Sequence, residues 1–265
     1  MAGKGVGTFL GHPRVNVERQ LLFVVLAYNE ERNVARLLDS ICALRLDGFQ
    51  PSLLLVNDGS TDRTREVILG YADRLPVTVV DHPTNLGVGQ GFRTGFAAAL
   101  ARLSDDDVIV TIEADNTSDL GILPAMLQQL AAGGEVSLAS CYAPGGGVKG
   151  TTMTRVFLSK IANGIIRWFC GVSEVHTYSS FYRAYRVRAL RAVVQQYGER
   201  FIEEPGFVCM VEVVVKLHRC RIRMTEVPMI LDGAQRKGAS KMKIVRTIAG
   251  YARFAWRNLF HDHAR

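Results

Sequence analysis

Residues 108–115 read Val108-Ile109-Val110-Thr111-Ile112-Glu113-Ala114-Asp115, an apolar run of strand length that ends in two carboxylates. Carboxylates at the end of a buried strand cost free energy unless a cation lies beside them. Their oxygens suit Mg²⁺ or Mn²⁺, which proteins hold through one or two carboxylates together with substrate phosphates. We therefore predict that Glu113 and Asp115 bind a divalent metal. The alternative is a turn in which Asp115 caps a helix that begins near Thr117.

Segments on both sides of this strand repeat a strand-then-helix pattern. The other predicted strands are short apolar runs, at residues 21–27, 52–56, 76–80 and 136–139. The predicted helices show apolar residues at helical spacing, at residues 30–46, 62–74, 88–103 and 122–130. This alternation predicts an α/β fold with a mostly parallel sheet covered by helices on both faces. Ligands bind such sheets beyond the carboxyl ends of the strands.

Polar residues also follow two other predicted strands. The first strand leads into Tyr28-Asn29-Glu30, and the second into Asn57-Asp58-Gly59-Ser60. A carboxylate at such a site accepts hydrogen bonds from a nucleoside base or a ribose hydroxyl, which predicts a nucleoside site beside the metal. The alternative for each of these residues is a helix cap.

Length and composition favour one compact domain. The chain has 265 residues, of which 48% are hydrophobic, and no Ser/Pro-rich linker or internal repeat divides it. Five cysteines form no CxxC pair, which argues against a structural zinc site and favours a reducing cytoplasm. The N-terminal 20 residues lack the apolar core of a signal peptide. The longest apolar stretch, Leu21 to Tyr28, is far shorter than the roughly 20 residues that span a bilayer.

The net charge of +7 favours anionic partners such as phosphates, nucleic acids or lipid surfaces. A nucleic-acid partner is the least favoured, because no basic stretch carries interleaved aromatic residues. A dinucleotide-binding dehydrogenase is disfavoured as well: Gly87-Val88-Gly89-Gln90-Gly91-Phe92 does not complete GxGxxG and does not follow a strand end. The chain also lacks the GxxxxGK[ST] phosphate loop.

Five motifs occur in the order found in family-2 glycosyltransferases: Leu26-Ala27-Tyr28-Asn29-Glu30-Glu31, Val56-Asn57-Asp58-Gly59-Ser60-Thr61-Asp62, Asn85-Leu86-Gly87, Glu113-Ala114-Asp115 and Lys237-Gly238-Ala239-Ser240-Lys241-Met242. The chain resembles most the branch of that family that contains the dolichol- and polyprenyl-phosphate mannosyltransferases. The resemblance spans residues 22–242, most of the chain. It implies a GT-A fold, a nucleotide-diphosphate sugar as donor, a divalent metal, and inversion of the anomeric carbon.

The resemblance also implies roles for individual residues. Donor binding falls to seven positions: Ala27, Tyr28, Glu30, Asp58, Glu113, Asp115 and Lys241. The metal falls to Asp115, with Glu113 beside it. Arg155 and Ser159 match an Arg and a Ser four residues apart that contact the acceptor phosphate, and Arg183, in a later segment, is implied as a further acceptor-binding residue. Asp115 and Arg155 are the candidate catalytic residues.

The motif pattern departs from the family at several positions. Glu113 stands where the family has Asp, Thr117 where it often has Gln, and Cys141 where it often has Arg. Ala234-Gln235 replaces the customary Asp-Arg, although Asp232 and Arg236 lie nearby. These departures leave open the role of Glu113 and the identities of sugar and acceptor.

The C-terminal residues predict an amphipathic helix. From Lys241 to Phe260, apolar residues gather on one helical face and Lys and Arg on another. The helix either lies in the interface of an anionic membrane or packs its apolar face on the domain. We divide the chain into an N-terminal extension (residues 1–20), the glycosyltransferase domain (21–240), and the helix and tail (241–265). A lipid-linked acceptor would place the protein peripherally on the cytoplasmic face of the membrane.

Acceptor chemistry shapes the expected mechanism. A phosphate monoester is already anionic near neutral pH, so a polyprenyl-phosphate acceptor needs no general base. The predicted function is sugar transfer from a nucleotide-diphosphate donor, such as GDP-mannose or a UDP-hexose, to polyprenyl phosphate. The alternatives are a soluble or polysaccharide acceptor, and a binding module for nucleotide sugars that does no catalysis.

Overall fold

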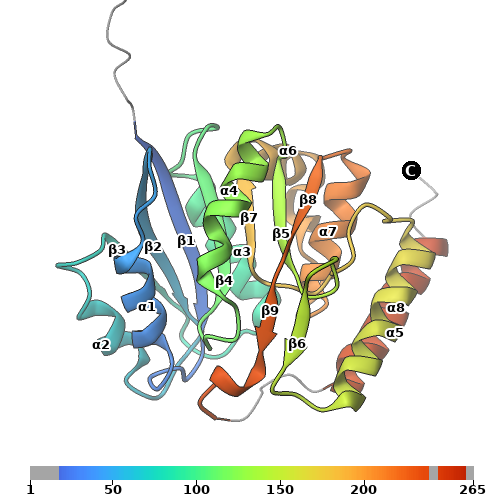
Figure 1. The fold of residues 1–265 in the computed structure, drawn as a ribbon, viewed down its shortest axis with the longest axis horizontal. Helices are drawn as coiled ribbons and strands as arrows, with labels where there is room; N and C mark the ends of the chain where they lie inside the picture. The colour runs from blue at the N-terminus through green and yellow to red at the C-terminus, as the bar shows by residue number, and fades with distance from the viewer. Residues whose placement is uncertain (1–17, 239–243, 261–265) are drawn as a thin grey trace, which may run out of the picture.

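The computed structural model describes residues 18–238 and 244–260 (Figure 1). Within them, seven strands form one sheet in the order β3-β2-β1-β4-β7-β5-β8. Their bounds are β1 (Arg19–Ala27), β2 (Phe49–Asn57), β3 (Val77–Asp81), β4 (Val108–Glu113), β5 (Val136–Ser140), β7 (Arg183–Arg186) and β8 (Met224–Pro228). Only β7 runs antiparallel to its neighbours, β4 and β5. The predicted α/β fold with a mostly parallel sheet is therefore confirmed.

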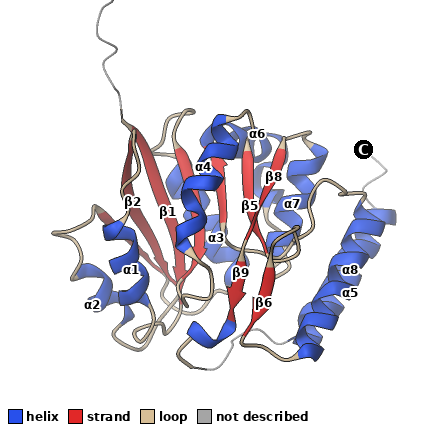
Figure 2. Ribbon diagram, viewed as in Figure 1, coloured by secondary structure: helices blue, strands red, loops and turns tan. Residues whose placement is uncertain are grey.

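Helices cover both faces of the sheet (Figure 2). One face carries α1 (Val34–Ala43), α2 (Thr64–Leu69) and α4 (Leu123–Ala131), and the other carries α3 (Val88–Leu100), α6 (Val187–Tyr197) and α7 (Cys209–Arg219). Strand β1 supplies both cores, because successive side chains point to opposite faces. Leu21, Phe23 and Val25 enter the core under α1, whereas Leu22 and Val24 enter the core under α3.

Glycines allow α3 to approach the sheet closely. A Cβ atom at Gly91 would lie 2.5 Å from Leu26 Cδ2, and one at Gly95 would lie 2.7 Å from Val24 Cγ1. Both separations are shorter than real Cβ contacts, so a larger residue at either position would have to push these side chains aside. The glycine-rich stretch that superficially resembles a dinucleotide loop thus serves helix-to-strand packing.

Two long helices stand beyond the β8 edge of the sheet: α5 (Met153–Cys170) and α8 (Ile244–Phe260) (Figure 1). They contact each other, and α8 buries Tyr251, Phe254 and Ala255 in the core that also contains α3. A small parallel sheet of β6 (Gly147–Lys149) and β9 (Ile230–Asp232) lies between them and β4. Three short 3₁₀ helices complete the described elements: η1 (Leu120–Ile122), η2 (Gly198–Phe201) and η3 (Gly233–Gln235).

The packing of α8 decides between the two expectations for the C-terminal residues. Its buried side chains show that α8 uses an apolar face against the domain. Among the described helices, none combines the length and the apolar character needed to cross a bilayer.

Candidate active site

A cavity of about 1150 Å³ opens at the carboxyl ends of β1, β2 and β4. Helices α5 and α8 and the loop at residues 204–208 form its opposite wall. Seven of the residues that the sequence singled out line this cavity: Ala27, Tyr28, Glu30, Asp58, Glu113, Asp115 and Ser159. The structure thus gathers at one place the strand-end motifs that are far apart in the chain.

Asp115 is buried directly beyond β4, and both of its carboxylate oxygens accept hydrogen bonds. Oδ1 accepts from the Thr117 amide (3.0 Å) and the Thr117 hydroxyl (2.7 Å). Oδ2 accepts from Arg236 through Nε (2.6 Å) and also through Nη2. A guanidinium therefore supplies the cation that a buried carboxylate requires.

Glu113 lies beside Asp115 in a strongly desolvated position. Burial first, and then the negative charge of Asp115, raise the pKa of Glu113 to about 7. The Ser118 hydroxyl donates to Glu113 Oε2 at 2.9 Å, which partly offsets the shift. A nearby cation would favour the ionised form, because opposite charge lowers the pKa of a carboxyl group.

The ends of β1 and β2 are tied together by hydrogen bonds between the two motifs. The Asn29 amide donates to the Ser60 hydroxyl (3.0 Å), and the Glu30 amide donates to the Thr64 hydroxyl (2.8 Å). The Asn29 side chain accepts in return from the Thr61 amide at 2.8 Å. These contacts fix the loop that carries Tyr28 and Glu30 along the cavity wall.

Asp58 holds the loop that precedes α3. Its Oδ1 accepts from the Leu86 amide (2.9 Å), and its Oδ2 accepts from the Gly87 amide (3.0 Å). His82 contacts Oδ1 through Nδ1 at 2.7 Å. Asp58 is therefore a loop anchor in this structure as well as a residue of the cavity wall.

A strap at residues 232–238 crosses the ends of β1 and β4. The Asp232 amide donates to the Thr117 carbonyl (3.0 Å), and the Lys237 amide donates to Asn33 Oδ1 (2.9 Å). Asn33 also donates to the Lys237 carbonyl at 3.1 Å and to Glu30 Oε2 at 2.7 Å. The strap places Arg236 on Asp115, a contact across 121 residues that the local sequence pattern did not reveal.

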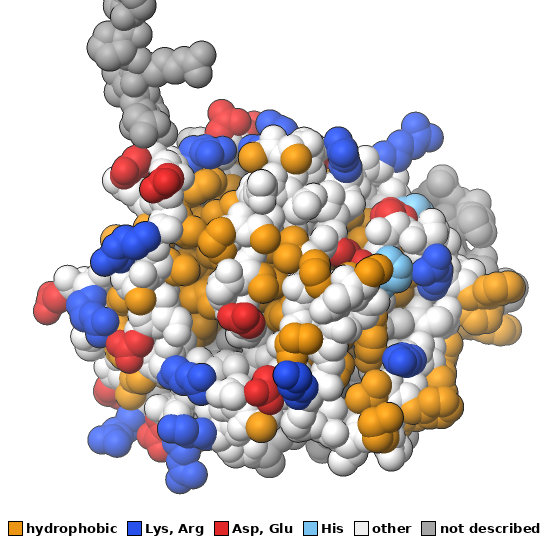
Figure 3. Space-filling model, in the orientation of Figure 1, with side chains coloured by type: hydrophobic (Ala, Val, Ile, Leu, Met, Phe, Trp, Pro, Cys, Tyr) orange, Lys and Arg blue, Asp and Glu red, His pale blue; other side chains and the backbone are white. Residues whose placement is uncertain are grey.

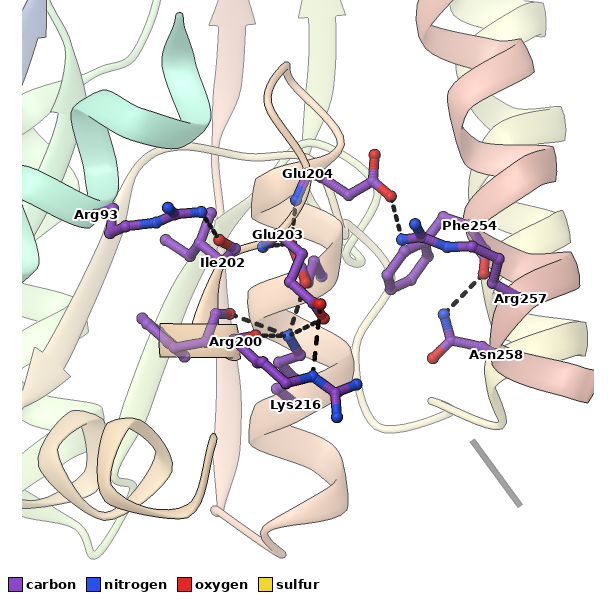
Figure 4. Close-up of polar contacts among 11 residues, drawn as sticks. Arg93, Arg200, Ile202, Glu203, Glu204, Lys216, Phe254, Arg257 and Asn258 are labelled. Atoms are coloured by element: carbon purple, nitrogen blue, oxygen red, sulfur yellow. Dashed lines mark hydrogen bonds and ion pairs between the residues drawn. The ribbon is translucent and has the colours of Figure 1, made fainter. Parts of the chain in front are cut away.

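The opposite wall is anchored by a buried acidic group (Figure 4). Glu204 accepts from Arg257 of α8 at 2.5 Å, and burial raises its pKa while Arg257 opposes the shift. The amides of Glu203 and Glu204 both donate to Glu212 Oε2 at 2.9 Å. Lys216 neutralises Glu212 at 2.7 Å, so charged partners from α7 and α8 together fix this loop. The sequence analysis did not identify Glu204.

Ser159 and Arg155 lie one turn apart on α5. Ser159 lines the cavity and hydrogen-bonds to Tyr142, a contact that counters the rise in the Tyr142 pKa caused by burial. The backbone of Arg155 is helical, and its side chain lies outside what the structure describes. Lys241, a predicted donor-binding residue, also lies outside the described residues.

Arg183 differs from its expected placement. Its side chain is 0% exposed, and it donates to the carbonyls of Tyr178 (2.8 Å) and Met210 (2.9 Å). A guanidinium with no exposed surface cannot contact an acceptor phosphate, so this placement disagrees with the acceptor-binding role. Arg183 instead joins β7 to α7.

The carboxylates at the end of β4 provide only part of a binding site for a hard divalent cation. Glu113 and Asp115 supply the oxygen ligands that such ions prefer. Among residues 18–238 and 244–260, no three His, Cys, Asp or Glu side chains gather to hold a metal. A metal here would therefore need further oxygen ligands from substrate and water, and it would share Asp115 with Arg236.

Residues 22–194 match the family model of glycosyl transferase family 2. The chain belongs to this family. As a family-2 glycosyltransferase, it is 28% identical to the polyprenol monophosphomannose synthase of Mycolicibacterium smegmatis, over 86% of this chain and 83% of that protein. It is 26% identical to the dolichol-phosphate mannosyltransferase of Pyrococcus furiosus, over 88% of this chain and 62% of that protein. The chain thus spans less than two thirds of the Pyrococcus relative.

The fold of this family-2 glycosyltransferase also occurs in solved structures. The glucosyl-3-phosphoglycerate synthase of Mycobacterium tuberculosis, crystallised with Mn²⁺, UDP and glucosyl-3-phosphoglycerate, superposes with a TM-score of 0.60. The alignment covers 91% of this chain and 78% of that one, at 18% sequence identity. The likeness confirms the GT-A type of fold that the sequence motifs implied.

Proposed function

We propose that this protein transfers a sugar from a nucleotide-diphosphate donor, GDP-mannose or a UDP-hexose, to a polyprenyl phosphate. The observation that carries the proposal is the cavity itself. It joins the polar ends of β1, β2 and β4 to α5, which bears Ser159 on the cavity and a row of apolar side chains on the outside. A polar donor and a lipid phosphate suit these two walls. The names of the Mycolicibacterium and Pyrococcus relatives support the lipid acceptor.

The donor would lie along the strand ends. Ala27, Tyr28 and Glu30 would contact the nucleoside, and Asp58 would support it from the loop it anchors. Arg236 and Lys237 lie where the strap crosses the cavity, so their charges would face the diphosphate. Lys241 remains a proposed donor contact from the sequence pattern alone.

A divalent Mg²⁺ or Mn²⁺ would be held by Asp115, with Glu113 beside it. When bound, such an ion neutralises the negative charge that develops on the departing diphosphate. Arg236 carries a positive charge that could also neutralise the diphosphate. In this structure it donates hydrogen bonds to Asp115 Oδ2. We propose that Arg236 transfers its hydrogen bonds to the diphosphate oxygens when the donor enters, which exposes Asp115 Oδ2.

The acceptor phosphate would be positioned by Arg155 and Ser159 on α5. Its oxygen is already a nucleophile, so no residue has to remove a proton. The task of the chain is to hold that oxygen in line with the anomeric carbon and the leaving diphosphate. Attack from the side opposite the leaving group inverts the anomeric carbon.

The outer side of α5 is the proposed membrane contact. It exposes Met153 (81%), Phe157 (64%) and Trp168 (85%), side chains that normally avoid water. Figure 3 shows apolar side chains gathered along the edge of the molecule where α5 lies. Lys160 and Arg167 lie on the same helix, which matches an anionic lipid surface. We therefore propose peripheral attachment to the cytoplasmic face of a membrane through α5.

A panel of donors and acceptors tests the proposal. The protein is incubated with labelled GDP-mannose or UDP-glucose, Mg²⁺ or Mn²⁺, and either polyprenyl phosphate or 3-phosphoglycerate. The expected result is transfer to the lipid that stops with EDTA and in Asp115→Ala. Transfer only to the soluble phosphate would contradict the lipid acceptor, and nucleotide binding without any transfer would contradict the enzyme.

A further inference from the structure

A second, smaller pocket lies beside the cavity and has no part in the proposed transfer. It encloses about 390 Å³, within the range of roughly 300–1,000 Å³ typical of small-ligand sites. Cys141 and Tyr142 line both this side pocket and the main cavity, so the two hollows are neighbours.

One face of α5 forms much of the side pocket. Lys160, Asn163, Gly164 and Arg167 line it, and their spacing of three and four residues puts them on one side of the helix. Counted around α5 at about 100° per residue, this side lies between Ser159 and the exposed apolar row. The side pocket therefore stands between the proposed acceptor position and the proposed membrane contact.

The side pocket is cationic. Within the described chain, neither Lys160 nor Arg167 pairs with a carboxylate. His176 also lines the pocket, and its Nδ1 is bound to Glu226 at 2.7 Å. Glu226 accepts in addition from the His176 and Thr177 amides, at 2.8 and 2.9 Å, so local donors balance its negative charge. The two α5 cations remain available for an anion.

A buried donor points to the same kind of ligand. Asn163 is 9% exposed, and its Nδ2 is buried without a hydrogen-bond partner among the described residues. A buried donor without a partner destabilises the protein. A ligand that offers several oxygen acceptors would satisfy Asn163 and pair with Lys160 and Arg167 at once. A phosphate group has that chemistry.

We propose that the side pocket binds the phosphate of an anionic phospholipid headgroup, separately from the acceptor lipid. The membrane is the favoured source because the exposed apolar row of α5 borders this face of the helix. The inference rests on the proposed attachment of α5 to a membrane, and it adds a site that recognises the lipid headgroup. Such a site would orient Ser159 and the cavity toward the lipid surface.

Two pairs of variants test the site without disturbing the proposed catalytic residues. Lys160→Gln with Arg167→Gln removes its charge, and Arg63→Gln with Arg188→Gln removes the same charge from two exposed positions elsewhere. Gly164→Leu fills the pocket, because a Cβ atom there meets nothing within 4 Å, and Gly164→Ala is its control. The measurement is cosedimentation with phosphatidylcholine vesicles that contain or lack phosphatidylglycerol.

We expect the Lys160/Arg167 variant to lose about 30-fold in affinity for the anionic vesicles, since each basic residue near such a surface contributes about fivefold. Gly164→Leu should lose about tenfold without any change in charge. The Arg63/Arg188 variant and Gly164→Ala should stay within about threefold of the wild type. Equal losses in the two charge variants, or unchanged binding in Gly164→Leu, would overturn the proposal.

A soluble arm separates the two sources of phosphate. Glycerol 3-phosphate is added at millimolar concentration, and the Tm of wild type and Gly164→Leu is measured. Suppose that Tm rises only in the wild type and that the two proteins bind anionic vesicles equally well. This result would assign the pocket to a free phosphate and overturn the lipid source. Both arms measure binding, so a failure of sugar transfer leaves them readable, and their failure leaves sugar transfer untouched.

Discussion

The two walls of the cavity are stabilised differently. On one side, the ends of β1, β2 and β4 are fixed by short-range polar contacts such as Asn29 with Ser60 and Asp115 with Thr117. On the other side, α5 presents Ser159 to the cavity and leaves large side chains such as Trp168 in water on its outer face. A polar wall held by many hydrogen bonds suits a small donor that must be placed accurately. A helix with an exposed apolar row suits a surface of hydrocarbon chains, because there the depth to which the side chains insert matters more than the exact position of each one.

The polar wall predicts the largest change in activity. We expect Asp115→Asn to lower the rate of sugar transfer about 100- to 1,000-fold. The divalent ion proposed to neutralise the leaving diphosphate would lose its charged ligand. Product formation at saturating donor measures the effect. Asp119→Asn is the matched control, since that exposed carboxylate only caps η1 through the Gly121 amide. Equal rates in the two variants would remove Asp115 from the proposed site.

Asp58 tests whether the polar wall is also a source of stability. Asp58→Asn should lower the free energy of unfolding by about 2–3 kcal/mol, because it weakens charged hydrogen bonds to the Leu86 and Gly87 amides in a buried place. Asp39→Asn removes an exposed ion pair with Arg74 and should cost less than about 1 kcal/mol. Urea unfolding compares them, and equal costs would argue that Asp58 anchors nothing.

Trp168 tests the apolar wall. Trp168→Ala should weaken binding to anionic vesicles about tenfold, because burial of a large apolar side chain in the interface is lost. Its unfolding free energy should not change, since the side chain is 85% exposed. Leu69→Ala, an exposed apolar change on α2, should leave vesicle binding unchanged. If Trp168→Ala lowers the unfolding free energy but leaves vesicle binding unchanged, the Trp168 side chain packs against another part of the protein and does not contact a membrane.

An effect on a single constant is expected where the two walls meet. Ser159→Ala should raise the KM for polyprenyl phosphate about tenfold, the low end for one hydrogen bond to a charged group, and leave the KM for the donor unchanged. Ser173→Ala, three residues beyond the end of α5, should change neither constant. Steady-state kinetics with each substrate varied in turn measures both. A donor KM that rises alone would assign Ser159 to the polar wall.

The sequence predicted the polar wall more fully than the apolar one. Its strand-end motifs are local: each lies within a few residues of an apolar run, and parallel strands bring such ends to the same edge. The pattern did not identify β7, because Arg183-Ala184-Tyr185-Arg186 has no apolar run. It also left open whether the C-terminal helix contacts a membrane or packs on the domain, whereas the exposed apolar row lies on α5.

The sequence by itself determined the α/β fold, the glycosyltransferase family and the residues at the strand ends, since periodicity and turn motifs are written in adjacent residues. The tertiary structure decided which charges meet. It buried Arg183 against backbone carbonyls, placed Arg236 on Asp115 and set Glu204 against Arg257. These partners are distant in the chain, so only the packing of strap, helices and sheet brings them together.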